Sequence, residues 1–351
     1  MTRPFLPPWW AKNPHVQTIL PVLTKVDLPV LSRQRLELSD GDFIDLDWLG
    51  DPCNASSIVV ILHGLEGSSD SHYVRRLLRD CHRLGLCAVV HHHRGCSGET
   101  NRLARSYHSG DTQDISHTLA YLQQHFPQAK LHAVGYSLGG NVLAKYLGEL
   151  QGNSAIDRAV IVSAPLQLSA CAKRLEKGFS TVYQWHLIKQ LRQKVIDKLN
   201  KKTFINQTSA NQTSVNQAAI TLKQVGKLKT FYQFDHQVTA PLHGFEGVDD
   251  YYAKSSGLGY LSKINRPTLL IHAADDPFMT ADVIPAISQL GTDVTYELHP
   301  HGGHVGFIDG GTPLKPRFYL EQRILHFLTM NNEGIESSES SLKPKKTPLS
   351  M

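Results

Sequence analysis

The sequence predicts an α/β fold with a mostly parallel, twisted sheet, helices on both faces of that sheet and an inserted, mainly helical cap. Three observations predict it. From residue 57 onward, short aliphatic runs alternate with amphipathic helical patterns, which is typical of a parallel sheet covered by helices. A segment with strict two-residue alternation precedes them, and the strand–helix alternation stops after residue 165 and resumes at 264. We therefore expect one core, residues 1–165 and 264–330, with the cap at 166–263.

The elements of the core follow in order along the chain. Residues 35–49, "RLELSDGDFIDLDWL", alternate around Asp-Gly and predict an antiparallel hairpin at the edge of the sheet. Aliphatic runs predict strands at 57–64, 86–93, 130–135, 158–165, 267–276 and 294–300. Amphipathic patterns predict helices at 71–85, within 110–127, at 138–150, near 281–290 and around 317–329. The polar segment 331–351 cannot bury a core, so we expect a disordered tail.

Composition and charge exclude several classes of function. The 351 residues are 41% hydrophobic and 19% charged, which suits a large globular core. The net charge of +5 forms no basic stripe interleaved with aromatics, so no nucleic-acid partner is expected. The sequence contains no run of about 18 apolar residues, so we expect no membrane span. The N-terminus lacks the apolar region of a signal peptide. Five cysteines without C-x-x-C or metal spacing favour a cytoplasmic location and no metal site.

The stretch "AVGYSLGGN", residues 133–141, contains the candidate nucleophile Ser137. A serine hydroxyl is a poor nucleophile unless a base lies within hydrogen-bond reach. Gly135 and Gly139 complete G-x-S-x-G, the turn that lifts a serine out of the sheet in α/β-hydrolases, and the expected strand and helix flank it. The alternative is a serine with a purely structural role in a turn.

The template places an acid after the serine in the chain. The segment "HAADDPFM" supplies Asp275 and Asp276 where the penultimate strand should end. We favour Asp276 as the triad acid because it precedes a short x-apolar-apolar run. The neighbouring carboxylate is expected to bind the loop.

A histidine must follow the last strand, and "HPHGGHVGF" offers three. We favour His304, because Gly302 and Gly303 give the backbone freedom to aim its ring inward. His301 is the second candidate, and His299 is expected to be a solvated loop residue. Because the carboxyl ends of parallel strands meet at one edge of a sheet, the three catalytic side chains can converge.

Acyl transfer also needs hydrogen-bond donors for the developing oxyanion. The amide of Leu138, directly after the serine, is the first candidate. The second should come from the loop after the strand "VVILHG", where His63-Gly64 resembles the H-G element of lipase oxyanion loops. We assign it to the Leu65 amide, with Glu66 and Gly67 closing the turn.

Several separated motifs make the resemblance more specific. In order they are "PPWWAKNPHVQTILP", "HGLEGSSDSHYVRRL", "HHHRGCSGE", "GYSLGGNVLAKYLGE", "FDHQVTAPLHGFEGVDDYY", "DDPFM" and "HGGHVGF". Together they resemble the YheT-type α/β-hydrolases, a bacterial group related to eukaryotic ABHD lipid esterases, over residues 1 to about 330. The resemblance implies a serine hydrolase acting on carboxylic esters without a cofactor, with the triad at Ser137, Asp276 and His304. Its partner would be a small-molecule ester, hydrophobic or with a short-to-medium acyl group, including lipid-derived esters.

Other interpretations remain open. The chain could transfer acyl groups to an alcohol or amine, because Ser-Leu-Gly-Gly resembles the elbow of some acetyltransferases, or it could be a binding protein that has lost its chemistry. His91 and His93 share one face of a strand and could hold a metal, although packing is the default. Asp111 and Asp114, at the start of a helix, are expected to be capping and dipole residues and not catalytic acids. The aromatic residues of the cap could line an acyl pocket or form the cap's own core: Phe179, Tyr183, Trp185, Phe231, Tyr232 and Phe234.

Overall fold

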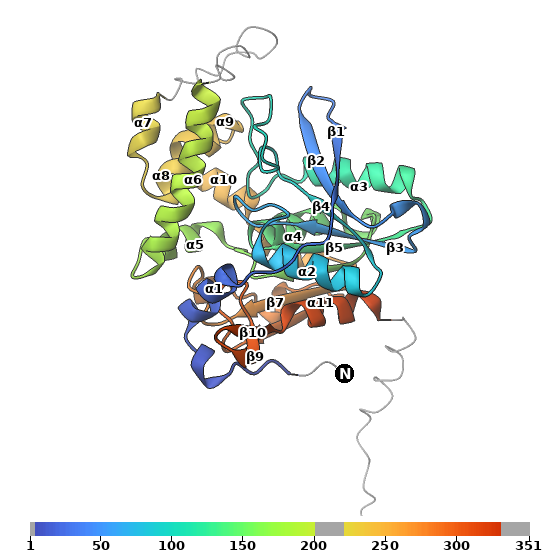
Figure 1. The fold of residues 1–351 in the computed structure, drawn as a ribbon. Helices are drawn as coiled ribbons and strands as arrows, with labels where there is room; N and C mark the ends of the chain where they lie inside the picture. Colours follow the sequence, from blue (N-terminus) through green and yellow to red (C-terminus); the bar gives the residue numbers. More distant parts are fainter. Residues whose placement is uncertain (1–3, 201–220, 331–351) are drawn as a thin grey trace, which may run out of the picture.

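The computed structural model describes residues 4–200 and 221–330, so the predicted tail at 331–351 lies outside the described residues. In this part of the chain, eight strands form one sheet in the order β1-β2-β4-β3-β5-β6-β7-β8 (Figure 1). Their bounds are β1 Ser32–Glu37, β2 Phe43–Leu49, β3 Ser57–Leu62, β4 Cys87–His91, β5 Lys130–Tyr136, β6 Ile156–Val162, β7 Thr268–Ala273 and β8 Val294–His299.

The predicted α/β class is confirmed by the directions of these strands. Strands β4, β3, β5, β6, β7 and β8 pair in parallel. The β1–β2 hairpin pairs antiparallel with β4 and so forms one edge of the sheet, as its alternating sequence predicts. The turn of this hairpin uses Gly41 at φ 85°, a conformation that residues with a Cβ rarely adopt. The loops that follow the parallel strands therefore all lie at the same end of the sheet, where the carboxyl ends of these strands meet.

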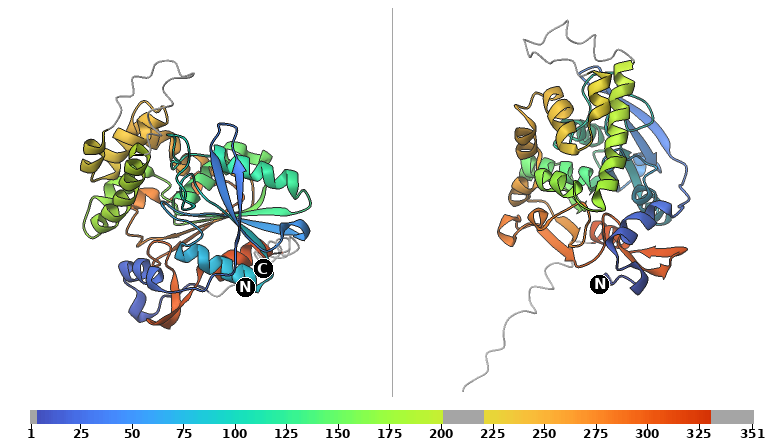
Figure 2. Two further views of the ribbon diagram at one scale, coloured as in Figure 1. Left: turned by 45° about the horizontal axis from the view of Figure 1, so that its top comes forward. Right: turned by 90° about the vertical axis from the view of Figure 1, so that its left-hand side faces the viewer.

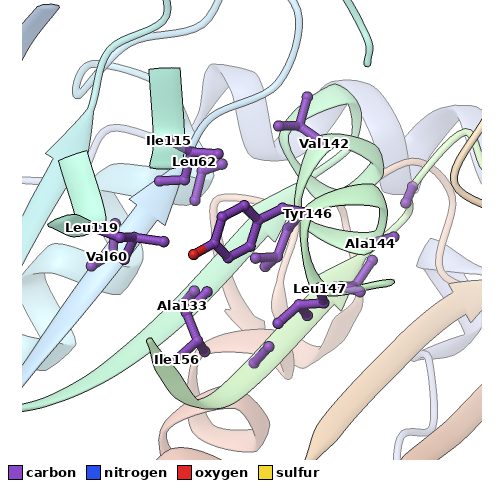
Figure 3. Close-up of a cluster of buried hydrophobic side chains, with 14 of the residues drawn as sticks. Val60, Leu62, Ile115, Leu119, Ala133, Val142, Ala144, Tyr146, Leu147 and Ile156 are labelled. Carbon is purple, nitrogen blue, oxygen red and sulfur yellow. The ribbon is translucent and has the colours of Figure 1, made fainter. Parts of the chain in front are cut away.

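The inner strands bury both of their faces, because their residues alternate between two separate clusters. On β3, Ile58, Val60 and Leu62 face one cluster, whereas Val59 and Ile61 face the other. The first cluster is completed by helices α3 (Gln113–His125) and α4 (Leu138–Leu150), and Figure 3 shows Val60 and Leu62 among residues of both helices. Helices α2 (His72–Arg83) and α11 (Leu320–Thr329) cover the opposite face. This continuous apolar burial explains why the strand sequences are aliphatic rather than alternating.

Between β6 and β7, residues 166–200 and 221–263 contain several helices that lie together on one side of the sheet (Figures 1 and 2). They are α5 Leu168–Leu175, α6 Ser180–Asn200, α7 Leu222–Lys227, α8 Phe231–Phe234, α9 Ala240–Leu242 and α10 Val248–Ser255, with a π-helical turn at Asp235–Thr239. Part of this segment has an apolar core of its own, which includes Ile188, Val195 and Val225. None of the helices in residues 4–200 and 221–330 combines the length and the apolar character that crossing a bilayer needs.

Three local predictions were wrong or incomplete. Residues 281–290 form no α-helix but two short 3-10 turns, Ala281–Val283 and Ile287–Gln289, since Pro285 between them cannot donate a helical hydrogen bond. Helix α1, Pro14–Leu23, was not predicted. A small hairpin of β9 (Ile308–Thr312) and β10 (Lys315–Phe318) was missed as well, and it delays the start of α11 to residue 320.

Candidate active site

Ser137 stands at the turn between β5 and α4 and has a strained backbone. Its φ of 50° and ψ of −120° lie outside the regions that residues with a Cβ favour, at a cost on the order of 1–3 kcal/mol. The flanking glycines are required by space: a Cβ at Gly135 would lie 2.6 Å from the carbonyl oxygen of Gly139, and one at Gly139 would lie 2.5 Å from that of His63. The G-x-S-x-G motif therefore permits a turn that larger residues would block.

The structure brings the three predicted catalytic side chains together. The Nε2 atom of His304 lies 2.9 Å from the Ser137 hydroxyl oxygen, and its Nδ1 atom lies 2.8 Å from Oδ2 of Asp276. The other carboxylate oxygen of Asp276 accepts the amide hydrogen of Phe278 at 2.8 Å, and the Asp276 side chain is fully buried. Serine, imidazole and carboxylate thus form one hydrogen-bonded chain that joins the carboxyl ends of β5, β7 and β8.

Asp275 holds the histidine loop and does not contact the ring of His304. Its Oδ1 atom accepts the amide hydrogen of Gly303 at 3.0 Å, and its Oδ2 atom lies 3.1 Å from Nδ1 of His301. Burial raises the pKa of Asp275, against these two hydrogen bonds. His301 is the nearest alternative in sequence, but its side chain is 42% exposed and faces Asp275. His299 packs edge-on against Phe5 instead of lying in a solvated loop.

The loop that carries His304 is fixed from several sides. Gly302 and Gly303 have φ values of 147° and 57°, as their proposed role requires. A Cβ at Gly303 would lie 2.6 Å from the carbonyl oxygen of Pro14 in α1. The His304 amide donates to the Thr18 hydroxyl of the same helix at 3.0 Å, and the Phe278 ring stacks on the imidazole with centroids 4.0 Å apart.

Helix α1 was not predicted as a support of the site, although the sequence contains a local signal for it. Asn13 accepts the amide hydrogens of His15 and Val16, and Pro14 occupies the first helical position. This Asn-Pro pair is a common helix start. Gln17 of α1, fully buried, exchanges two hydrogen bonds with the backbone of Ile308, which follows the histidine loop. The helix therefore fixes both sides of His304.

The amides of Leu65 and Leu138 are left available beside Ser137. Within residues 4–200 and 221–330 neither amide hydrogen has an acceptor, whereas both neighbours of Leu65 are bonded. The Gly64 amide donates to the Tyr73 hydroxyl at 2.9 Å, and the Glu66 amide donates to the Tyr107 hydroxyl at 2.9 Å. The first N–H groups of a helix have no partner within it, and Leu138 is the first residue of α4. Two donors can therefore serve an oxyanion at this point.

Two cavities meet at Ser137 and His304. The narrower one, about 140 Å³, extends among α5, α6, α8 and α10 and is mostly apolar, with Phe231 and Phe234 in its wall. The wider one, about 940 Å³, is an open groove between α1 and the start of α6, lined by Phe179, Tyr183 and Trp185. The cap aromatics thus divide: two line the narrow cavity, three line the groove, and Tyr232 is 43% exposed.

The consecutive histidines 91–93 lie beneath the site and bind protein groups. The Nδ1 atom of His91 lies 2.9 Å from the Thr118 hydroxyl, and Nε2 of His92 lies 2.7 Å from Asp47. Burial lowers the pKa of His91 well below its ordinary value and that of His93 to about 4, so both rings are neutral at pH 7. Among the residues that the structure describes, no three side chains of His, Cys, Asp or Glu form a metal-ligating group.

The prediction for Asp111 and Asp114 holds in part: neither residue caps α3, whose N-cap is Thr112, but Asp114 has the first-turn position expected of a dipole residue. Asp114 does lie in the first turn of α3, but its carboxylate forms a two-pronged ion pair with the buried Arg94, at 2.7 Å for each bond. Asp111 pairs with Arg105 at 2.8 Å. The loop that begins at Arg94 is therefore held to α3.

The fold and this arrangement define the class of the protein. Residues 57–311 match the family model described as alpha/beta hydrolase fold, and the chain belongs to that family. The chain is 44% identical, over 93% of its own length and 93% of the relative's, to the Escherichia coli (strain K12) protein named "Putative esterase YheT", which confirms the resemblance to the YheT-type group.

More distant relatives extend over nearly the whole chain. The human protein named Phospholipase ABHD3 is 26% identical over 96% of this chain and 82% of its own, and human Monoacylglycerol lipase ABHD2 is 26% identical over 93% and 80%. Among solved structures, the Pyrococcus furiosus esterase Pf2001 superposes with a TM-score of 0.52 at 14% identity, covering 87% of this chain and 98% of its own. That likeness supports the fold.

Proposed function

We propose that this chain is a serine hydrolase that cleaves carboxylic esters. The observation that carries the proposal is the continuous hydrogen-bonded chain Ser137–His304–Asp276 at the junction of two cavities. Relatives named esterase, phospholipase and monoacylglycerol lipase support the same class of reaction. In this proposal Ser137 is the nucleophile, His304 the general base and acid, and Asp276 the carboxylate that orients the imidazole.

The reaction would proceed in two halves. His304 takes the hydroxyl proton as the Ser137 oxygen attacks the ester carbonyl, and Asp276 stabilises the imidazolium that forms. The amides of Leu65 and Leu138 hold the oxyanion of the tetrahedral intermediate, a contribution typically on the order of 10²–10³ in rate for each donor. The protonated imidazole then gives its proton to the leaving alcohol. Water, activated by the same histidine, releases the carboxylic acid from the acyl-enzyme.

The two cavities suggest how an ester would lie. An acyl chain fits the narrow cavity, because its walls are mostly apolar and it leaves Ser137 toward the helical segment. The alcohol part would then occupy the wide groove between α1 and α6, which has room for a larger group. Hydrophobic esters of short to medium acyl length, including lipid-derived ones, are the substrates that this division favours.

A covalent probe tests the nucleophile directly. A fluorophosphonate should label the wild-type chain at Ser137 and should leave Ser137→Ala unlabelled, because the probe bonds to an activated serine oxygen. Turnover of p-nitrophenyl esters should fall by about 10⁴-fold or more in the same variant. Labelling or turnover that survives the substitution would refute the proposal.

A panel of p-nitrophenyl esters with rising acyl length tests the placement of the acyl chain. The value of kcat/KM should rise with chain length until the narrow cavity is full and then fall. A matched variant reduces the volume of the cavity. Because Ala172 lines that cavity, Ala172→Leu should shift the acyl length with the highest kcat/KM toward shorter chains. Analysis of products with and without added alcohols would separate hydrolysis from acyl transfer.

A further inference from the structure

The turn that carries the Leu65 amide is tied to helix α6 by an ion pair that is partly buried. The Lys194 ammonium of α6 lies 3.0 Å from Oε1 of Glu66, the residue directly after Leu65. The Glu66 side chain is 6% exposed, and Glu66 has a φ of 54°, which is unfavourable for a residue with a Cβ. A strained residue next to a candidate oxyanion donor is thus held from a helix more than 120 positions further along the chain.

Tyr107 holds the same residue from a second side. Its hydroxyl accepts the amide hydrogen of Glu66 at 2.9 Å and donates to Oε1 of Glu66 at 2.6 Å. Burial, together with the Glu66 carboxylate, raises the pKa of Tyr107 well above its ordinary value, so the hydroxyl keeps the proton that it donates. The Lys194 ammonium also lies 5.2 Å from the centre of the Tyr107 ring. The backbone and the carboxylate of Glu66 are therefore both fixed.

Removing the ammonium would leave the Glu66 carboxylate buried without a cation. Breaking a buried ion pair by removing one partner is costly, and the cost is relieved when the remaining charge moves toward water. Here that movement would release the left-handed backbone conformation of Glu66. The change would shift Leu65, whose N–H group lies in the preceding Gly64–Leu65 peptide. An oxyanion donor is effective only when it is held in place before the reaction.

We propose that Lys194 is a positioning residue that holds the Leu65 amide in place through Glu66, so that docking of α6 completes the oxyanion hole. This inference rests on the proposed hydrolase function. It assigns to the helical segment a part in the chemistry beyond shaping the cavity. The proposed reaction step that depends on it is the stabilisation of the tetrahedral oxyanion.

Lys198, one helical turn further along α6, provides a matched control. Lys198 is buried, and its ammonium binds the segment before Tyr107. It donates to the carbonyl oxygens of Leu103 and Arg105 and to the Ser106 hydroxyl at 2.9–3.2 Å. Burial lowers the pKa of Lys198 to about 7. It has no contact with Glu66 among its hydrogen bonds. Loss of Lys198 thus weakens the attachment of α6 without touching the oxyanion turn.

The test compares Lys194→Met with Lys198→Met in the hydrolysis of one p-nitrophenyl ester. We expect kcat to fall about 10- to 100-fold in Lys194→Met, with KM changed about twofold or less, because the lost interaction acts mainly in the transition state. Lys198→Met should lower the thermal midpoint and leave kcat within about twofold. Lys194→Arg, which keeps a cation near Glu66, should recover most of kcat.

A second measurement separates the oxyanion hole from general damage to the site. The inhibition constant of an alkyl trifluoromethyl ketone, whose serine adduct carries an oxyanion, should rise in Lys194→Met by about the factor that kcat/KM falls. The inhibition constant of the matching carboxylic acid should stay within about twofold. Equal kcat values for the two methionine variants, or unchanged ketone binding, would overturn the inference. Activity that survives Ser137→Ala would instead overturn the proposed function.

Discussion

The side chains proposed to react stand at the ends of parallel strands, whereas the groups that hold them come from helices α1 and α6. The backbone is strained in the segments that follow these strands: φ is 50° at Ser137, directly after β5, and 59° at Val305 and 48° at Phe307 in the loop after β8. The two helices contribute side chains that bind these loops: Thr18 and Gln17 from α1, and Lys194 from α6. The comparison teaches that the strand ends place the atoms proposed to react, and that distant helices stabilise the strained loops by fixing them.

The largest effect should separate the two adjacent carboxylates at the end of β7. Asp276→Asn should lower kcat by a factor on the order of 10³–10⁴, because an amide can present its N–H₂ to the imidazole and favour the wrong tautomer. Asp275→Asn should cost about tenfold or less, since Asp275 binds only Gly303 and His301. Steady-state hydrolysis of one p-nitrophenyl ester measures both. A greater loss at Asp275 would show that the loop carboxylate, and not the buried one, orients His304.

A smaller effect should come from α1. Thr18→Val removes the acceptor of the His304 amide and should lower kcat about 3- to 10-fold, in line with the loss of one hydrogen bond. Thr24→Val is the matched control, because both hydroxyls donate to the carbonyl oxygen four residues earlier in α1. Thr24 does not contact the histidine loop, so its substitution should leave kcat within about twofold. If both variants behave alike, α1 acts on stability and not on the position of His304.

The sequence predicted the strand ends well because their signals are local. A strand followed at once by Gly-x-Ser-x-Gly, an acidic pair at the end of a strand, and a histidine preceded by two glycines are each contained in about ten residues. The steric need for Gly135 and Gly139 is equally local, since the turn itself brings their neighbours close. Catalytic roles for these residues remain predictions, and the covalent probe tests them.

The supports could not be predicted, because they depend on contacts between segments far apart in the chain. Nothing near Lys194 marks it as a partner of Glu66, and a lysine on an amphipathic helix is usually solvated. The pair arises only when α6 packs beside the turn after β3. The wrong prediction of a helix at 281–290 has a local cause. The apolar pattern there favours a helix, but Pro285 interrupts it.

A different kind of effect concerns the helical segment alone, namely the pH dependence of its stability. Asp235 is buried, accepts hydrogen bonds from Thr239 and Tyr252, and has a pKa raised by burial to about 6. A carboxyl whose pKa is higher in the folded chain than in the unfolded chain binds more protons when folded, so stability falls as pH rises between about 4 and 6. Above that window the loss is complete and constant.

Asp235→Asn should therefore gain free energy of unfolding relative to wild type as pH rises through this window, by on the order of 1–3 kcal/mol at pH 7. Urea unfolding of both chains between pH 4.5 and 8 measures the difference. Asp249→Asn, a change at an exposed carboxylate of α10, should leave the difference from wild type independent of pH. If the difference in free energy of unfolding between Asp235→Asn and wild type does not change with pH, the two hydroxyl donors already offset the cost of burying the charge. The helical segment would then contain no destabilising buried charge comparable to the backbone strain at the strand ends.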